Sequence, residues 1–210
     1  MPLEKSPSPN TRPRSKKKLA GCERREAILE ASVRLFLKNG FHATSFTMIA
    51  EEVGLSVAGL THYFPTKVEL LLAVLDKRDQ ATVHLVPDPI PHWDDFLAAL
   101  KEINRRNVEI PETIRAFSLM NAESLLENHP AKAWFHKRTL DLRDRLAHSI
   151  HQAIDEKEIR DDTDPQSLAS EIIAMMDGLQ MLWLRFPQST DMVVIFDAYL
   201  DRLNAFLKRD

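Results

Sequence analysis

The chain has 210 residues, of which 44% are hydrophobic and 28% are charged, a composition that supports a sizeable core. The single cysteine, Cys22, excludes an intramolecular disulfide and a cysteine-rich zinc module, and it suits a reducing compartment. No apolar run approaches the roughly 20 residues that a helix needs to cross a bilayer, and the N-terminus lacks the apolar segment of a secretory signal, so we expect a cytoplasmic protein without a membrane partner.

The total charge of −3 conceals a basic N-terminal end. Residues 1–25 hold eight Lys and Arg residues against two Glu residues, so the rest of the chain carries a net charge of −9. A basic end on an acidic body indicates a polyanionic partner at that end. Residues 1–22 are rich in Pro, Ser and basic residues, and we expect them to form a disordered basic arm. A tail that only keeps the chain in solution is the alternative.

A first helix is predicted from near Glu23, where apolar residues begin to recur at helical spacing, to Gly40, which suits the end of a helix. A loop is expected over residues 41–45. Ser45 is predicted to cap a second, short helix, and Gly54 is predicted to break it.

The third predicted helix lies in the stretch SVAGLTHYFPTK (residues 56–67), with Ser56 as its cap and Pro65 as its stop. So short a helix cannot be stable by propensity, and it must dock one face on its neighbours. Leu60 and Phe64 supply that face. The other face carries small residues and hydrogen-bonding groups: Val57, Ala58, Thr61 and His62. This combination suits a recognition helix in the DNA major groove, with the second helix as the positioning helix of a helix-turn-helix.

A fourth helix is predicted from a cap at Thr66 to about residue 85, and prolines then mark a boundary: Pro87, Pro89 and Pro91. Five further helices are expected over residues 92–106, 111–128, 130–157, 165–186 and 190–208. Three of them begin at a proline, where the missing N–H costs nothing: Pro111, Pro130 and Pro165. Few glycines and no sustained two-residue alternation argue against a sheet, so the predicted fold class is all-α.

The chain from Gly40 to Leu70 resembles the N-terminal domain of TetR-family transcriptional repressors. The residues that carry the resemblance are Gly40, Phe41, Thr44, Ser45, Ile49, Ala50, Val53, Gly54, Leu55, Ser56, Leu60, His62, Tyr63, Phe64, Pro65, Thr66, Lys67 and Leu70. Two later segments resemble one subgroup of the family: HPAKAWF (129–135) and DGLQMLWL (177–184). The resemblance implies a helix-turn-helix domain over residues 23–76, a C-terminal domain over residues 77–210 with a ligand pocket, a homodimer and a DNA operator.

The candidate DNA-binding residues are Thr44, Ser45, Ser56, Val57, Ala58, Gly59, Thr61, His62, Tyr63 and Lys67. The resemblance implies phosphate contacts for Tyr63 and Lys67, and an anion is favoured at the helix N-terminus where Lys67 lies. The alternative is a packed Tyr63 and a solvated Lys67. A combined capping and phosphate role is expected for Thr44 and Ser45. The family most often has a phosphate-contacting Tyr where this chain has Thr61, and often Thr or Ser where it has Gly59.

The candidate ligand-binding residues combine large, adaptable side chains with polar ones: Phe96, Phe117, Met120, Asn121, Glu123, Trp134, Met176, Asp177, Gln180 and Met181. The polar groups would be costly to bury alone, so they bond each other and Arg143, or they orient a ligand. If Glu123 and Asp177 are both ionised, a cationic ligand is favoured. If Arg143 neutralises one of them, a neutral polar ligand fits equally well.

Neither a metal nor another cofactor is assigned. Asp144, His148 and His151 share one helical face at a spacing that zinc ligands can have, but such a face is more often solvated. The chain has no glycine-rich phosphate loop, nucleophile elbow or HExxH motif, and we do not expect an enzyme. Catalysis by a carboxylate pair of Glu123 and Asp177 is the enzymatic alternative, and a buried ion pair of these carboxylates with Arg143 or Arg138 is the structural one.

The sequence therefore predicts a ligand-responsive, DNA-binding transcriptional repressor that acts as a homodimer on a near-palindromic operator. Its partners would be double-stranded DNA, a small-molecule effector and a second copy. Apolar stripes on the last two helices are expected to build the dimer: Ile172, Met175, Leu179, Leu182, Val193, Val194, Phe196, Leu200, Leu203 and Phe206. The alternative is a constitutive or architectural regulator whose C-terminal domain only dimerises.

Overall fold

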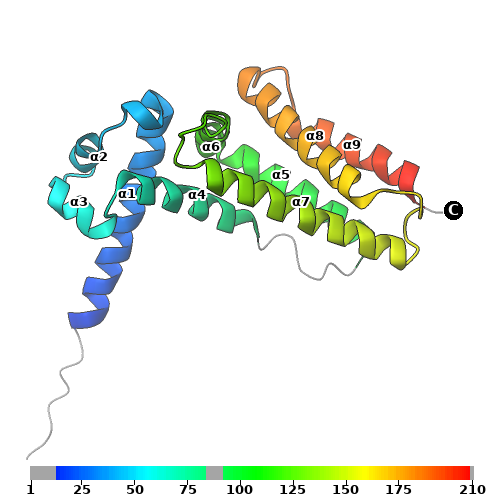
Figure 1. Ribbon diagram of the computed structural model, residues 1–210, viewed down its shortest axis with the longest axis horizontal. Helices are drawn as coiled ribbons and strands as arrows, with labels where there is room; N and C mark the ends of the chain where they lie inside the picture. Colours follow the sequence, from blue (N-terminus) through cyan, green and yellow to red (C-terminus); the bar gives the residue numbers. More distant parts are fainter. Residues whose placement is uncertain (1–12, 84–91, 209–210) are drawn as a thin grey trace, which may run out of the picture.

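A computed structural model describes residues 13–83 and 92–208, with side chains for residues 21–80 and 92–208. Its elements are α1 (Pro13–Ala43), α2 (Phe46–Glu52), α3 (Val57–Tyr63), α4 (Lys67–Val83), α5 (Trp93–Glu109), α6 (Pro111–Glu123), α7 (Lys132–Asp155), α8 (Pro165–Arg185) and α9 (Met192–Leu207) (Figure 1). The described residues contain no strand beyond one isolated bridge between Ile159 and Lys208, so the all-α class is confirmed. None of the helices in these ranges is long and apolar enough to cross a membrane.

The N-terminal helix starts earlier than predicted. It begins at Pro13, whereas the sequence suggested Glu23, so residues 13–22 of the expected arm are helical. Proline fits the first position of a helix because its missing N–H has no partner there in any case. Residues 1–12 of that arm, and the boundary prolines Pro87, Pro89 and Pro91, lie outside the described residues.

Local capping signals are confirmed in the helix-turn-helix. The hydroxyls of Ser45, Ser56 and Thr66 each accept a hydrogen bond from the backbone N–H three residues further on, at 3.0, 3.0 and 3.1 Å. These bonds satisfy amides that have no partner within a helix, and they fix where α2, α3 and α4 begin.

Gly40 kinks α1 where the sequence predicted the helix to end. Its φ of 75° and ψ of 168° lie in a region that only glycine adopts readily, yet one more helical turn follows, so most of the expected loop over residues 41–45 is helical. A Cβ at this position would also come within 3.2 Å of Glu123 Oε1 on α6. Gly40 therefore both bends α1 and lets α6 approach it.

The later helices match the prediction within a few residues, except α6. It ends at Glu123, whereas the sequence suggested residue 128, and turns lead from there to α7. Ser124 closes α6 by donating its hydroxyl to Asn121 O at 2.6 Å, and Pro130 restricts the backbone of His129 to a non-helical conformation. Pro111 and Pro165 lie in the first turns of their helices as predicted.

Two apolar cores hold the fold together, and the first crosses the predicted domain boundary at residue 76. It contains residues of α1 to α4, but it also includes Ala116, Phe117 and Met120 of α6 and Phe135 of α7. The second core joins α5, α7, α8 and α9. In Figure 1, α1 to α3 lie at one end, the pair of α8 and α9 at the other, and α4 and α6 bridge the two parts.

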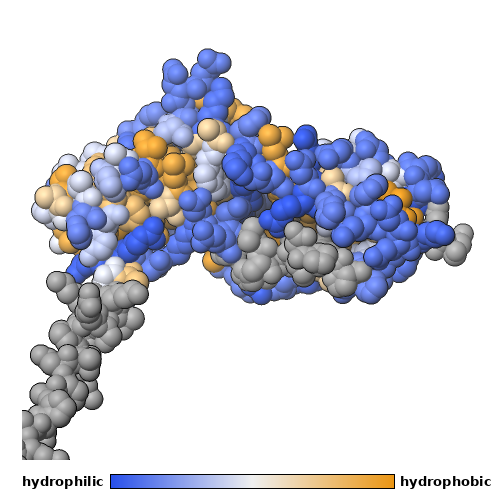
Figure 2. Space-filling view, turned by 60° about the horizontal axis from the view of Figure 1, so that its bottom comes forward, coloured by the Kyte–Doolittle hydropathy of each residue, from blue (hydrophilic) through white to orange (hydrophobic). Residues whose placement is uncertain are grey.

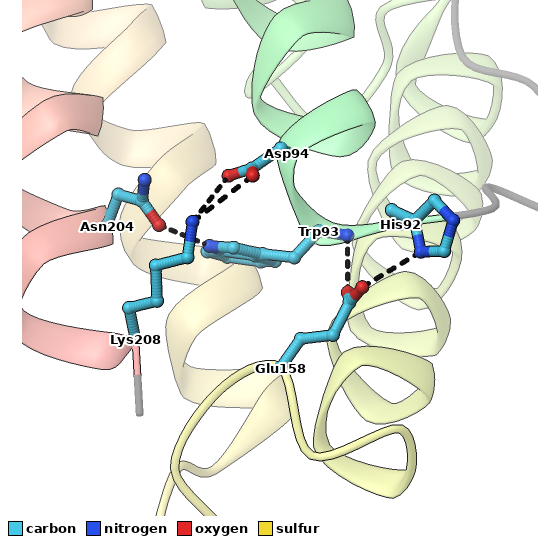
Figure 3. A network of polar contacts seen from close by, with 6 residues as sticks. All are labelled: His92, Trp93, Asp94, Glu158, Asn204 and Lys208. Atoms are coloured by element: carbon cyan, nitrogen blue, oxygen red, sulfur yellow. Dashed lines mark hydrogen bonds and ion pairs between the residues drawn. The ribbon is translucent and has the colours of Figure 1, made fainter. Parts of the chain in front are cut away.

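A polar network fixes the start of α5 against the C-terminal end of the chain (Figure 3). Trp93 donates its backbone N–H to Glu158 Oε2 at 2.5 Å and its indole N–H to Asn204 Oδ1 at 2.9 Å. His92 Nδ1 lies 2.9 Å from Glu158 Oε1, and this hydrogen bond raises the pKa of His92. Lys208 Nζ lies 3.2 Å from Asp94 Oδ2.

Candidate DNA-binding surface and effector pocket

The two faces predicted for α3 are confirmed. Leu60 is fully buried in the first core, and Phe64, just after the helix, is 3% exposed. The opposite side is exposed and carries Val57, Ala58, Thr61 and His62. Thr61 donates its hydroxyl to Val57 O at 2.8 Å. In this rotamer Thr61 offers an approaching partner only acceptor lone pairs.

The remaining residues of α3 combine packing with access. Tyr63 is half-buried against the first core, and His62 meets the edge of its ring at 5.6 Å between centroids. A Cβ at Gly59 would lie 3.3 Å from the capping Ser56 Oγ. A bulkier residue at position 59 would therefore press on the cap.

Thr44 takes a different role from the one predicted. Its side chain is fully buried, with Oγ1 at 2.8 Å from Gly40 O and 3.1 Å from Leu35 O. The hydroxyl is thus committed to the C-terminal end of α1, and its burial argues against the expected phosphate contact. Ser45, by contrast, is exposed beside its cap hydrogen bond, where both expected roles are compatible.

Lys67 also points back into the protein. Its ammonium donates to Phe41 O and Thr44 O, each at 2.9 Å, and lies 3.4 Å from His42 O. It lies 4.3 Å from the centre of the Phe41 ring, and burial lowers its pKa. A cation on the final carbonyls of a helix is favourable both as a donor and toward the helix dipole. Lys67 therefore joins the start of α4 to the end of α1, a structural contact that neither of the two expected roles included.

A cavity of about 530 Å³ lies among α4, α5, α6, α7 and α8. Half of the candidate ligand-binding residues line it: Phe117, Asn121, Met176, Asp177 and Gln180. Gln180 is buried and donates to Ser118 Oγ at 2.8 Å, so its amide is held in place.

The other five candidates lie elsewhere: Phe96, Met120, Glu123, Trp134 and Met181. Phe96 stacks on Trp93 in the second core and Met120 belongs to the first, while the side chain of Met181 is exposed on α8.

Trp134 and Glu123 serve contacts between helices. Trp134 donates its indole N–H to Asp76 Oδ1 on α4 at 2.7 Å. Glu123 lies against the kink of α1, with Oε2 at 3.6 Å from Nε2 of the buried His129. His129 Nδ1 accepts a hydrogen bond from the Ala131 N–H, and burial lowers the pKa of His129. The pair of Glu123 and Asp177, on which the enzymatic alternative depends, therefore does not form.

Three arginines line the cavity, Arg78, Arg138 and Arg145, and the first two lie against the Phe117 ring. Arg78 is 9% exposed, its guanidinium lies 4.1 Å from the centre of the Phe117 ring, and burial lowers its pKa to about 10. Arg138 donates Nε–H to Asp79 Oδ1 at 2.6 Å. Burial raises the pKa of Asp177 although both arginines oppose this shift.

Arg143, the expected partner of the carboxylates, lies 3.7 Å from Asp144 and pairs with neither Glu123 nor Asp177. The sequence did not single out Arg78, because apolar periodicity does not show which polar residue of a helix faces inward.

Among the described residues, only His92, Glu156 and Glu158 bring three metal-ligating groups together. Both carboxylate oxygens of Glu158 are already engaged with His92 and the Trp93 N–H, which makes this cluster a structural contact. Asp144, His148 and His151 do not form such a group in the described part of the chain.

Protein-family models match both the N-terminal and the C-terminal part of the chain. Residues 28–74 match the family model of bacterial regulatory proteins of the tetR family, and residues 120–193 match the tetracyclin repressor-like C-terminal domain. The HTH-type transcriptional regulator RutR of Escherichia coli K12 is 33% identical over 144 residues, which are 68% of this chain and 62% of RutR. The chain thus matches less than two thirds of that relative's length.

Solved structures share the fold at lower identity. A TetR transcriptional regulator from Chloroflexus aurantiacus has a TM-score of 0.75 at 22% identity, covering 91% of this chain and all of that one. SmeT, the repressor of the SmeDEF multidrug efflux pump of Stenotrophomonas maltophilia, has a TM-score of 0.75 at 20% identity in its complex with triclosan, covering 90% and 93%. With a helix-turn-helix of the matching residues at one end and the matching helical domain at the other, the chain belongs to the TetR family of DNA-binding transcriptional regulators.

Proposed function

We propose that the protein is a repressor that binds a near-palindromic operator as a homodimer and releases it when a small molecule occupies the cavity among α4 to α8. The observation that carries the proposal is the exposed face of α3. A short helix held by a cap and by buried Leu60 presents small and polar side chains, as a major-groove reader requires.

The dimer is supported by apolar side chains that the described helices leave exposed near the C-terminus. Met181, Leu182 and Phe186 are 45%, 49% and 51% exposed at the end of α8, and Val194 and Phe206 of α9 are 62% and 67% exposed. The face of the C-terminal helices seen in Figure 2 is by contrast mostly hydrophilic. Several large apolar side chains left exposed on the same two helices are typical of an interaction surface.

The predicted dimer stripes contain both buried and exposed residues. Ile172, Leu179, Phe196 and Leu200 are buried in the second core, so they stabilise the single chain. The exposed members lie on the other side of α8 and α9, where Gly178 has no atom within 4 Å of the position of a Cβ. That open position would let a partner helix approach closely.

Coupling between ligand and DNA is supported by residues that belong to both parts. Phe117 packs in the core of the helix-turn-helix and also lines the cavity. Arg78 lies on α4, whose first residue, Lys67, holds the end of α1. A ligand that prefers one position of α4 would change the placement of α3, and by linkage DNA would weaken that ligand's binding equally.

The proposal is tested by selecting bound DNA from a random pool and then screening small molecules for release. We expect near-palindromic sites, because a two-fold dimer presents two copies of α3. His62→Ala should relax base preference, whereas His148→Ala, an exposed histidine of α7, should not. Asymmetric sites only, or full operator binding by a monomer, would contradict the proposal. Failure of every ligand to affect binding would favour a constitutive regulator.

The dimer surface is tested separately by light scattering. Met181→Asp and Val194→Asp should each yield monomers, because they place a charge in an apolar interface. Leu125→Asp is the matched control: Leu125 is 81% exposed on the turn after α6 and belongs to neither α8 nor α9. A dimer that persists in both interface variants would place the contact elsewhere.

A further inference from the structure

The cavity contains polar groups that the protein itself does not satisfy. Arg138 donates its Nε–H to Asp79 Oδ1 at 2.6 Å, so this nitrogen has its partner within the protein. Arg78 lacks such a bond: its Nε–H has no hydrogen-bond partner, and its Nη1 is 3.9 Å from Asp79 Oδ1, beyond hydrogen-bond reach. A buried cationic donor without a hydrogen bond costs more free energy than a hydrogen bond usually contributes, so the site is incomplete without an acceptor.

An unsatisfied acceptor lies on the same cavity wall. Asn107 is 2% exposed, and its Oδ1 has no hydrogen-bond partner. Asp177 also lines the cavity, and neither Arg78 nor Arg138 approaches its carboxylate within 4 Å. The cavity thus presents a buried cationic donor without a partner on α4, a buried acceptor without a partner on α5, and an exposed carboxylate without an ion pair on α8.

These groups set limits on the charge of a ligand. A simple anion would satisfy Arg78 but would face Asp177 and leave Asn107 Oδ1 without a donor. A simple cation would satisfy Asp177 but would be repelled by Arg78 and by Arg138, which lies 5.0 Å from the same Phe117 ring. Only a group that accepts at one end and donates at the other completes both sides.

We propose that the effector is a polar organic molecule without net charge that carries a carbonyl-type acceptor for Arg78 beside N–H donors for Asp177 and Asn107, as in an amide, with an apolar body against Phe117 and Met176. This inference rests on the proposed function and narrows the ligand class of its cavity. Of the cationic and the neutral polar ligand that the sequence left open, it selects the neutral one, because Glu123 lies at the kink of α1 and three arginines line the cavity beside Asp177.

Three probes of one shape separate the classes: benzamide, benzoate and benzamidine. All are planar and nearly isosteric, and they differ in charge and in the balance of acceptors and donors. Their affinities for the full-length protein without DNA, measured by calorimetry, should rank benzamide first. Binding tightest to benzoate or to benzamidine, equal binding of the three, or no binding up to their solubility would each overturn the proposal. Operator release by another ligand would leave the proposed function standing in any of those cases.

Two variants test the assignment of the groups. Arg78→Met keeps an apolar stem against Phe117 but removes the donor, and it should weaken benzamide by about tenfold or more. Asp177→Asn keeps the shape and removes the acceptor charge, so the ratio of benzamidine to benzoate affinity should fall by about tenfold. The second result is a change of ranking within one variant, which a general loss of stability would not produce.

Arg115→Met is the matched control. Arg115 is exposed on α6, the same helix as Phe117, and does not line the cavity. It should leave all three affinities unchanged. If Arg115→Met weakens benzamide as much as Arg78→Met does, or if Asp177→Asn leaves the ranking intact, the assignment of these groups to the ligand is wrong.

Discussion

Lys67→Met isolates the contact between the end of α1 and the start of α4. Methionine retains most of the aliphatic length but loses an ammonium that makes two hydrogen bonds of 2.9 Å. A hydrogen bond to a charged group contributes about 1.5–3 kcal/mol. The contact with the Phe41 ring contributes about 0.5 kcal/mol more at a partly exposed site. The burial that lowers the pKa of Lys67 offsets part of this gain. We therefore expect a loss of about 2 kcal/mol in the free energy of unfolding.

For a chain of this length such a loss lowers the melting temperature by roughly 4–8 °C. The measurement is thermal unfolding at a fixed protein concentration, because dimerisation makes the transition concentration-dependent. Lys77→Met is the control on the same helix: its exposed ion pair with Glu26 should contribute no more than about 1 kcal/mol.

The salt dependence of DNA binding decides between the two roles of Lys67. If Lys67 only holds the end of α1, its loss should lower the affinity for DNA with little change in how steeply that affinity falls with salt concentration. As a phosphate ligand, its loss should reduce the slope by about 0.9. An unchanged melting temperature together with that reduced slope would refute the structural role.

Three further perturbations test the junction and the cavity. Gly40→Ala should destabilise the fold by about 1–3 kcal/mol, because alanine resists the backbone angles and its Cβ meets Glu123, whereas Gly21→Ala, with open space around it, should not; equal urea unfolding midpoints would contradict this. Burial lowers the pKa of His129, so its neutral form contributes stability that is lost as the pH falls below about 6.5. In His129→Asn the free energy of unfolding should therefore depend less on pH between about pH 7.5 and pH 5, and an unchanged dependence would refute this reasoning. Phe117→Leu should leave operator affinity within about threefold while weakening release by an effector, and normal release would remove Phe117 from the cavity.

Local signals in the sequence were sufficient for the helices of the DNA-binding end. The caps at Ser45, Ser56 and Thr66 depend on residues three positions apart, and each formed as predicted. Likewise the apolar pair of Leu60 and Phe64 determined which face of α3 is exposed, because a helix this short has only one face to dock.

Contacts between distant helices could not be predicted in the same way. Met120 and Phe117 are both apolar residues of α6, yet Phe117 lines the cavity and Met120 does not, a difference set by the position of α1 and α8. For the same reason Lys67 was assigned to phosphate: its partners are carbonyls 23 to 26 residues earlier, and backbone carbonyls leave no signature in sequence. Arg78 was missed because the partner that buries it, the Phe117 ring, lies on another helix.

The first core also bears on how regulators of this kind can be recombined. Its members beyond the fourth helix are Ala116, Phe117 and Met120 of α6, Ala131 just before α7, and Phe135 of α7. A fragment that ends after α4 would expose the surface that these side chains cover. Helices α1 to α4 are therefore not a unit that can be transferred alone to another protein. In a chimera that combines α1 to α4 of one relative with the remaining helices of another, these five residues would have to come from the first relative or be chosen to pack against its α1, so that the core stays continuous.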